Sequence, residues 1–151
     1  GRKRIAMINH DLSYKYARLR ERGYKSVIHL RDLDYQAVEY ASDLSSGAGM
    51  AAMQNLLKDN PPDAVFAVSD TLAAGALRAI QQAGLRVPED IAVVGFDGTE
   101  LADMISLTTI EQPSRDIGRK AVDLLLNKID NPDAPTERVM MDWRFISRAS
   151  T

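Results

Sequence analysis

Cysteine is absent from the 151-residue sequence, and no apolar run is longer than the five residues 64–68. The first absence excludes disulfide frameworks, cysteine-ligated zinc and thiol nucleophiles. The second excludes a membrane-spanning helix, which needs about 20 apolar residues. The apolar stretch behind the basic residues 2–4 is also too short for a secretory signal, so a cytoplasmic location is expected.

Catalytic and metal-binding motifs are lacking as well. The sequence contains no glycine-rich dinucleotide or phosphate-binding loop and no G-x-S-x-G nucleophile motif. Its two histidines, His10 and His29, do not have the i, i+4 spacing of a zinc-binding helix. Without a nucleophile–base pair or a ligand cluster, the sequence predicts neither an enzyme nor a bound metal or cofactor.

What the chain does contain is the composition of a globular domain, with 45% hydrophobic and 26% charged residues. Its charge is unevenly distributed. Residues 1–31 hold nine lysines and arginines against two acidic residues, although the net charge of the whole chain is −2. A basic segment of this kind is typical of a solvated helix face, so these residues predict no direct contact with nucleic acid or with a membrane.

Short apolar segments alternate with segments of helical periodicity along the chain. Those with the character of strands are residues 5–8, 36–41, 64–68, 91–96, 108–110 and 138–146. Helices are predicted between them, beginning at Asp11 or Ser13, at Asp43 or Ser45, at Thr71 with Asp70 as its cap, and at Ser114. The alternation predicts an α/β fold of βαβ units, with a parallel, Rossmann-like sheet covered on both faces.

Polar side chains come directly after three of these strands, at Asn9, Ser69 and Asp97. Ligands of open parallel sheets bind outside the carboxyl ends of the strands, so these positions are expected to share one edge. Capping of the next helix is the favoured interpretation for Asp70. No helix is predicted directly behind Asp97, which makes that carboxylate the better candidate for binding a ligand.

A carboxylate beside an arginine suits a polyhydroxylated ligand. An aspartate accepts hydrogen bonds from two neighbouring hydroxyls, and the planar guanidinium donates several. Tyr14 and Tyr16, just beyond the first strand, are candidates for covering the apolar side of a sugar ring, although both also suit an ordinary surface or core position.

Two motifs carry a resemblance to a known family. Residues 87–97, Val-Pro-Glu-Asp-Ile-Ala-Val-Val-Gly-Phe-Asp, resemble the most recognisable stretch of the bacterial LacI/GalR transcriptional regulators. Residues 107–113, Leu-Thr-Thr-Ile-Glu-Gln-Pro, are similar to the family's next signature. The opening residues 1–8 and the closing residues 146–151 also match its pattern, so the resemblance is collinear through essentially the whole chain.

The resemblance implies the C-terminal lobe of an effector-binding domain with the periplasmic-binding-protein-like type I fold. On this basis residues 1–106 and the return strand 137–151 form the lobe, and residues 107–136 are a crossover that packs on a missing N-terminal lobe. A small effector, expected to be a carbohydrate, closes the two lobes and so controls DNA binding by an absent helix-turn-helix headpiece.

The family also implies the site residues and a homodimer. Effector contacts are expected at Arg20, Asp97, Ser69, Tyr14, Tyr16 and Leu44. Ser69 stands where the family usually has asparagine, and Leu44 stands where several members have an aromatic residue, so the two tyrosines are the candidates to replace that stacking face. For the dimer, the candidate contact is the helix over residues 71–83, where Ala73, Ala74 and Ala76 would permit close approach, although such small residues also pack well on a sheet.

Three alternatives remain open at this point. A periplasmic sugar-binding protein of a transport system would share the fold. An enzyme on a flavodoxin-like sheet would share the strand order but needs catalytic groups that the sequence lacks. In the third alternative the pocket is vestigial and the lobe only dimerises.

Overall fold

Six strands form one sheet in the order β2-β1-β3-β4-β5-β6. In the computed structural model, which describes residues 1–151, the strands are β1 (Ile5–Asn9), β2 (Ala37–Tyr40), β3 (Ala64–Ala67), β4 (Ala92–Asp97), β5 (Thr108–Glu111) and β6 (Arg144–Ile146). The pairings from β2 through β5 are all parallel, which confirms the predicted sheet. Only β6 pairs antiparallel, with β5.

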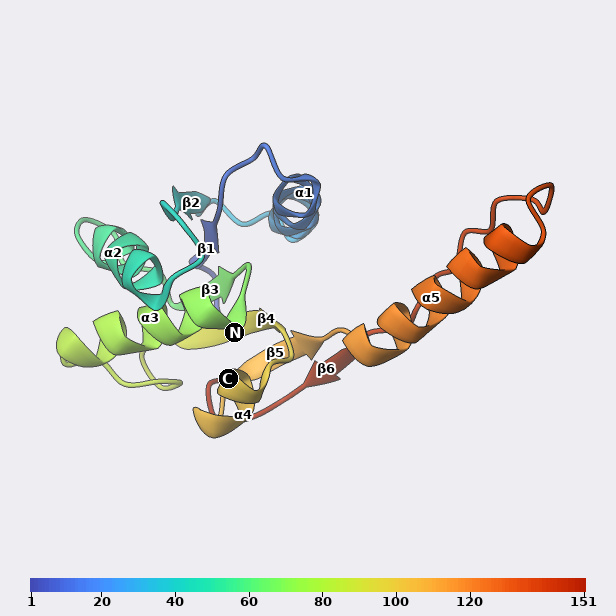
Figure 1. The fold of residues 1–151 in the computed structure, drawn as a ribbon. Helices are drawn as coiled ribbons and strands as arrows, with labels where there is room; N and C mark the ends of the chain where they lie inside the picture. Colours follow the sequence, from blue (N-terminus) through green and yellow to red (C-terminus); the bar gives the residue numbers. More distant parts are fainter.

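The helices cover both faces of the sheet. They are α1 (Lys15–Leu30), α2 (Ser46–Leu56), α3 (Asp70–Gln82), α4 (Glu100–Met104) and α5 (Ser114–Asp130). The chain moves in opposite directions along the sheet before and after β2, so right-handed crossovers place α1 on one face and α2 and α3 on the other. Figure 1 shows α1 on the opposite side of the sheet from α2 and α3.

The core lies between the sheet and these helices. Met7, Ile8, Val93 and Leu72 are fully buried there, because the strands are apolar on both faces and each helix contributes one apolar stripe. This burial of apolar area is what mainly stabilises the sheet–helix layers.

Helices α2 and α3 lie against each other at unusually close range. A Cβ added at Gly75 would stand 2.0 Å from the Ser46 carbonyl oxygen, and one added at Gly49 would stand 2.3 Å from the Leu72 carbonyl oxygen. Glycine is therefore required at both positions. Two of the alanines of the predicted dimer contact, Ala73 and Ala76, are fully buried inside the chain, so the expectation that they meet a second subunit is wrong.

Helix starts depend on caps that the sequence predicted only in part. Ser45 caps α2 as expected, accepting a hydrogen bond from the Ala48 amide. Ser69 rather than Asp70 caps α3, by accepting from the Leu72 amide. Helix α1 begins after Tyr14, which makes no side-chain cap hydrogen bond, so neither Asp11 nor Ser13 has the predicted role.

Two further differences concern the C-terminal third. The short helix α4 lies directly behind Asp97, where the sequence predicted no helix, since five residues are too few to show helical periodicity. The last strand is shorter than predicted: only residues 144–146 form β6, because its partner β5 is itself only four residues long.

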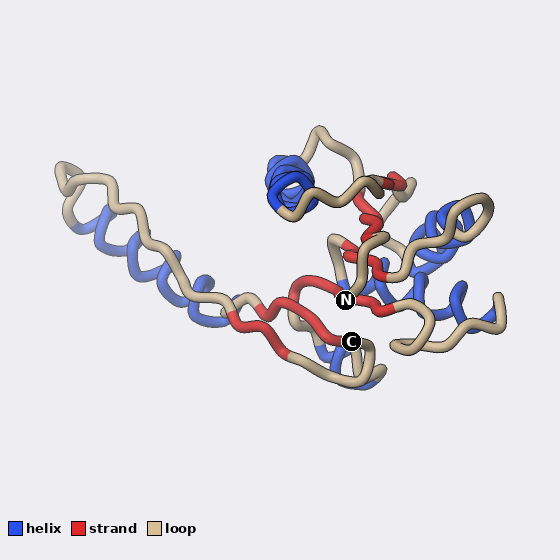
Figure 2. Tube along the Cα trace, turned by 180° about the vertical axis from the view of Figure 1, so that it is seen from behind, coloured by secondary structure: helices blue, strands red, loops and turns tan.

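Beyond β5 the chain leaves the layered structure. We call residues 112–143 the arm and residues 1–111 with 144–151 the body. Helix α5 projects from the body and the chain returns alongside it, as Figures 1 and 2 show from opposite sides. None of the 17 residues of α5 is buried. Residues 108–111, expected to belong to the crossover, form β5 within the sheet.

Candidate functional site

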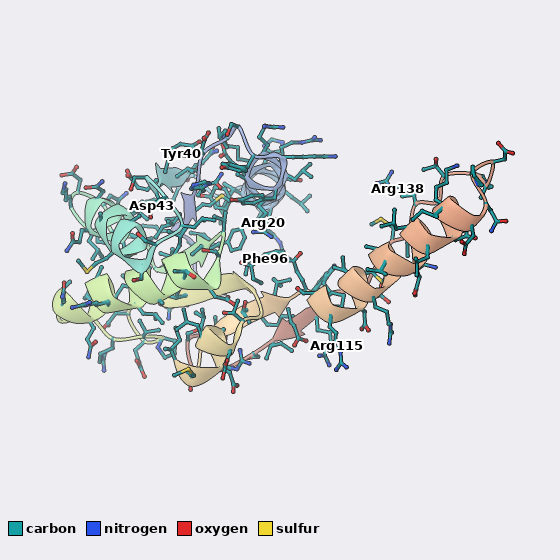
Figure 3. The ribbon with its side chains drawn as sticks, in the orientation of Figure 1. Arg20, Tyr40, Asp43, Phe96, Arg115 and Arg138 are labelled. Atoms are coloured by element: carbon teal, nitrogen blue, oxygen red, sulfur yellow. The ribbon has the colours of Figure 1, made fainter.

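Arg20 extends from α1 towards the carboxyl ends of β3 and β4. Its guanidinium lies over the ring of Phe96, with the central carbon 3.6 Å from the ring centroid, and the ring of Tyr16 lies at 5.1 Å. Figure 3 shows Arg20 and Phe96 next to each other between α1 and β4. One terminal nitrogen donates to the Val68 carbonyl oxygen at 2.5 Å. The ring and the carbonyl together hold the guanidinium in one orientation.

Asp97, the last residue of β4, completes this arrangement. Its Oδ1 lies 3.5 Å from the second terminal nitrogen of Arg20. The same oxygen accepts a hydrogen bond of 2.8 Å from the side-chain amide of Gln112. Both contacts involve Oδ1, and the Asp97 side chain is 35% exposed, so Oδ2 remains open to a ligand.

The electrostatics of the pair reflect its partial burial. Burial raises the pKa of the Asp97 carboxyl, and the positive charge of Arg20 opposes that rise. Burial likewise lowers the pKa of the Arg20 guanidinium, against the effect of Asp97. Removal from water strengthens charge-assisted hydrogen bonds to a ligand, so a half-buried ion pair with unused donors and acceptors is suited to bind hydroxyl groups.

The backbone at Asp97 is unusual. Asp97 has a φ of 117° and the next residue, Gly98, has a φ of 72°. A side chain at Gly98 would also collide with Glu111, because its Cβ would lie 2.5 Å from the Glu111 Cα. Positive φ angles at residues other than glycine are rare and cluster at functional sites, which agrees with a binding role for Asp97.

The other predicted site residues lie at different distances from this pair. Tyr16 is beside Arg20, and the Tyr14 ring is 5.6 Å from the Tyr16 ring and half exposed. Ser69 follows Val68 at the same edge, but its hydroxyl already accepts the capping hydrogen bond of α3. Leu44 stands apart on the loop after the edge strand β2, with 43% of its surface exposed.

Sequence reasoning missed two residues of the site. Phe96 packs against the guanidinium of Arg20, and Gln112 orients the Asp97 carboxylate. Gln112 carries the signal that identified Asp97, because it is a polar residue directly after a buried strand, β5. Phe96 gave no such signal, since an aromatic residue inside an apolar strand is indistinguishable from core.

A polar hollow adjoins the pair. It has a volume of about 680 Å³ and is lined by Asp97, Thr99, Glu111 and Arg115, among other polar residues of the body and the base of the arm. The carboxylate of Asp97 therefore faces open space as well as Arg20. No group of three or more histidine or acidic side chains is arranged to hold a metal ion.

Comparison with known proteins identifies the kind of domain. The protein-family model of the periplasmic binding protein-like domain matches residues 1–151. The ribose operon repressor of Escherichia coli K12 is 37% identical over 155 residues, covering 99% of this chain and 47% of the repressor. The chain belongs to the LacI-family effector-binding domains.

Solved structures of LacI-family proteins have the same fold. A lac repressor dimer bound to operator and to an anti-inducer superposes with a TM-score of 0.90 at 33% identity, covering all of this chain and 53% of that one. A LacI-family regulator from Enterococcus faecium with bound ribose has a TM-score of 0.90 at 29% identity. The match covers 100% of this chain and 57% of that one. These relatives are regulators, which favours the LacI-type interpretation over the transport alternative.

This LacI-family chain spans about half the length of the curated relatives that it matches. The other half of those proteins has no counterpart in residues 1–151. No helix of the chain combines the length and the apolar character that crossing a membrane requires.

Proposed function

We propose that this chain is the C-terminal lobe of the effector-binding domain of a cytoplasmic transcriptional regulator, and that a sugar binds against Arg20 and Asp97. The observation that carries the proposal is the geometry of this pair at the carboxyl edge of the sheet. Arg20 is held by Phe96 and Val68, while Oδ2 of Asp97 stays open. The bound ribose of the Enterococcus faecium relative supports a sugar as the ligand class.

In this proposal each side chain has a separate role. Asp97 accepts hydrogen bonds from one or two sugar hydroxyls, and Arg20 donates to a neighbouring hydroxyl. Gln112 keeps the carboxylate in place, and Tyr14 and Tyr16 supply an aromatic surface next to Arg20. Ser69 contributes at the margin of the site, and Leu44 lies farther from the pair, on the loop after β2.

The arm gives the proposal its second part. Apolar side chains are exposed along it, namely Ile117, Val122, Leu125, Leu126, Ile129, Val139, Met140 and Trp143. A stripe of this size is unfavourable in water and is typical of a surface that another element covers. We assign that element to the N-terminal half that the relatives possess and residues 1–151 do not. On this assignment the expected crossover 107–136 leaves the lobe only after β5, and the expected return 137–151 rejoins it at β6.

Regulation then follows from the difference between two lobe arrangements. A sugar that contacts both lobes binds the closed arrangement more tightly and shifts the population towards it, and only this difference in affinity can change DNA binding. DNA contact belongs to a headpiece outside residues 1–151.

The operator-bound dimer of the lac repressor supports a homodimeric regulator, and sedimentation of the intact protein as a monomer at micromolar concentration would contradict that state.

The test is calorimetry of the intact protein with D-ribose as the probe. Asp97→Ala removes a charged hydrogen-bond acceptor, and at about 1.5–3 kcal/mol per such hydrogen bond the affinity should fall at least about tenfold. Asp59→Ala, an exposed carboxylate between α2 and β3, is the matched control and should bind as the wild type does. Equal affinity of the Asp97→Ala variant and the wild type would exclude the proposed site.

A further inference from the structure

A fully buried carboxylate lies behind the candidate site. Asp70, the first residue of α3, is 0% exposed. Its Oδ2 accepts from the Thr99 amide at 2.7 Å and from the Thr99 hydroxyl at 2.9 Å, and its Oδ1 accepts from the Thr109 hydroxyl at 2.6 Å. Its partners are thus an amide and two hydroxyls, and the N-terminal end of α3 also favours its negative charge.

Strand β4 approaches this carboxylate closely. A Cβ at Gly95 would lie 2.5 Å from its Oδ1, so β4 has a glycine where the carboxylate approaches it. Gly95 pairs with Thr109 across β4 and β5. Asp70 therefore connects three elements, α3, β5 and the turn after β4, through one side chain.

Asp70 is hydrogen-bonded to the turn that carries Asp97. Asp97 and Gly98 have positive φ angles, and Thr99 follows them as the N-cap residue of α4. The Thr99 side chain makes no capping hydrogen bond to α4. Its hydroxyl is used by Asp70 instead. A strained conformation persists only where the surroundings impose it, and here the buried carboxylate holds the turn two residues from Asp97.

We propose that Asp70 is a positioning residue for effector binding: by holding Thr99 and Thr109, it keeps the turn after β4 in the conformation that places the Asp97 carboxylate beside Arg20. This inference rests on the proposed function. Asp70 itself does not touch the ligand, since its side chain is fully enclosed and both its oxygens are occupied.

The rival explanation is a purely structural one, in which Asp70 only stabilises the start of α3. Neighbouring threonines on β5 separate the two explanations. Thr109 bonds to Asp70, whereas Thr108 is equally buried and bonds on the other face of the strand, to Arg148 and Thr151. Thr109→Val and Thr108→Val each remove one buried hydroxyl from the same strand, but only the first removes a hydrogen bond to Asp70, the one that fixes its Oδ1.

The experiment measures D-ribose affinity by calorimetry on the intact protein. Asp70→Asn should weaken binding about tenfold and Thr109→Val about three- to tenfold, because each removes hydrogen bonds to a charged group that fixes the turn. Thr108→Val should bind within about twofold of the wild type, even though its free energy of unfolding should fall by about as much as that of Thr109→Val. Should Asp70→Asn fail to fold, the two threonine variants still decide the question.

A second readout does not need a ligand. Arg20 holds the pKa of Asp97 below the value that burial alone would give, so displacement of Asp97 from Arg20 should raise that pKa further in Thr109→Val and leave it unchanged in Thr108→Val. Carboxyl-carbon NMR titration of labelled aspartate measures it. Unchanged affinity and an unchanged Asp97 pKa in Thr109→Val would overturn the inference. If the wild type bound no ribose, the sugar proposal would fail, while the pKa comparison would still decide whether Asp70 positions Asp97.

Discussion

The body and the arm are built from similar amphipathic segments but end in opposite states. All 35 buried residues lie in the body, and α5 contributes none of them. Helix α3, with a comparable apolar stripe, has both a sheet and a second helix against it. The comparison teaches that an apolar pattern specifies a helix and its inner face, whereas burial of that face depends on which elements the chain supplies to cover it.

The largest expected effect comes from removing one leucine from each region. Leu72→Ala empties a fully buried position of α3, and such changes typically cost about 2–5 kcal/mol in the free energy of unfolding. Leu125→Ala on α5, where the leucine is 59% exposed, should change it by less than about 0.5 kcal/mol in the 151-residue chain. Urea denaturation of both variants gives these values.

The same pair of variants sharpens the comparison when the intact protein is used. If the N-terminal half that we propose covers the arm, Leu125→Ala should there cost about 2 kcal/mol or more, close to the effect of Leu72→Ala. A cost that stays near zero in the intact protein would mean that the arm remains uncovered, against the assignment made for its apolar stripe.

Two helical glycines should respond to alanine with opposite signs. At Gly75 in α3 the new Cβ would stand 2.0 Å from the Ser46 carbonyl oxygen, so Gly75→Ala forces α2 and α3 apart and should cost about 1–3 kcal/mol or more. At Gly118 in α5 nothing lies within 4 Å, and Gly118→Ala should stabilise the helix by about 0.5–1 kcal/mol. Thermal unfolding of the two variants would break the comparison if both shifts had the same sign.

Much of the fold could be predicted from the sequence, for reasons that these regions illustrate. The strands 5–9, 64–67 and 92–97 are short apolar runs ended by polar residues, and that pattern has few structural solutions other than a buried parallel sheet. The antiparallel direction of β6 depends on where the arm returns, which no local pattern encodes. Helix α4 was missed because one turn of helix has no measurable period.

The candidate site was predictable to a smaller extent. The family resemblance implied effector contacts at both Arg20 and Asp97, and the structure brings these two side chains to 3.5 Å of each other. The supporting groups escaped prediction because they act through backbone geometry or through partners distant in sequence. Asp70 is the clearest case: it lies 29 residues from Thr99 and 39 from Thr109, so its local sequence shows only a residue at the start of a helix.

The smallest expected effect is on the pH dependence of the free energy of unfolding. It compares the carboxylate of Glu21, inside the body, with that of Asp97, where the body meets the arm. Burial opposes ionisation of Glu21, but hydrogen bonds from Lys25, Asn9 and Tyr40 outweigh it, so the pKa of Glu21 is lowered. Its stabilisation is present above the ordinary glutamate pKa and is lost as the pH falls through the lowered value. Burial raises the pKa of Asp97, so the folded state binds this proton more tightly than the unfolded chain does.

The two carboxylates should therefore give opposite slopes. Between the ordinary aspartate pKa and the raised one, Asp97 makes the free energy of unfolding fall as the pH rises, and Asp97→Asn should remove that fall. Glu21→Gln should instead remove part of the loss of stability in acid. Denaturation between about pH 3 and 7 compares both with Asp116→Asn on the arm, where the exposed ion pair with Arg119 contributes little to stability. If both substitutions changed the pH dependence of the free energy of unfolding in the same direction, the prediction would be wrong. Asp97 would then be a structural carboxylate, satisfied by Arg20 and Gln112, rather than one available to a ligand.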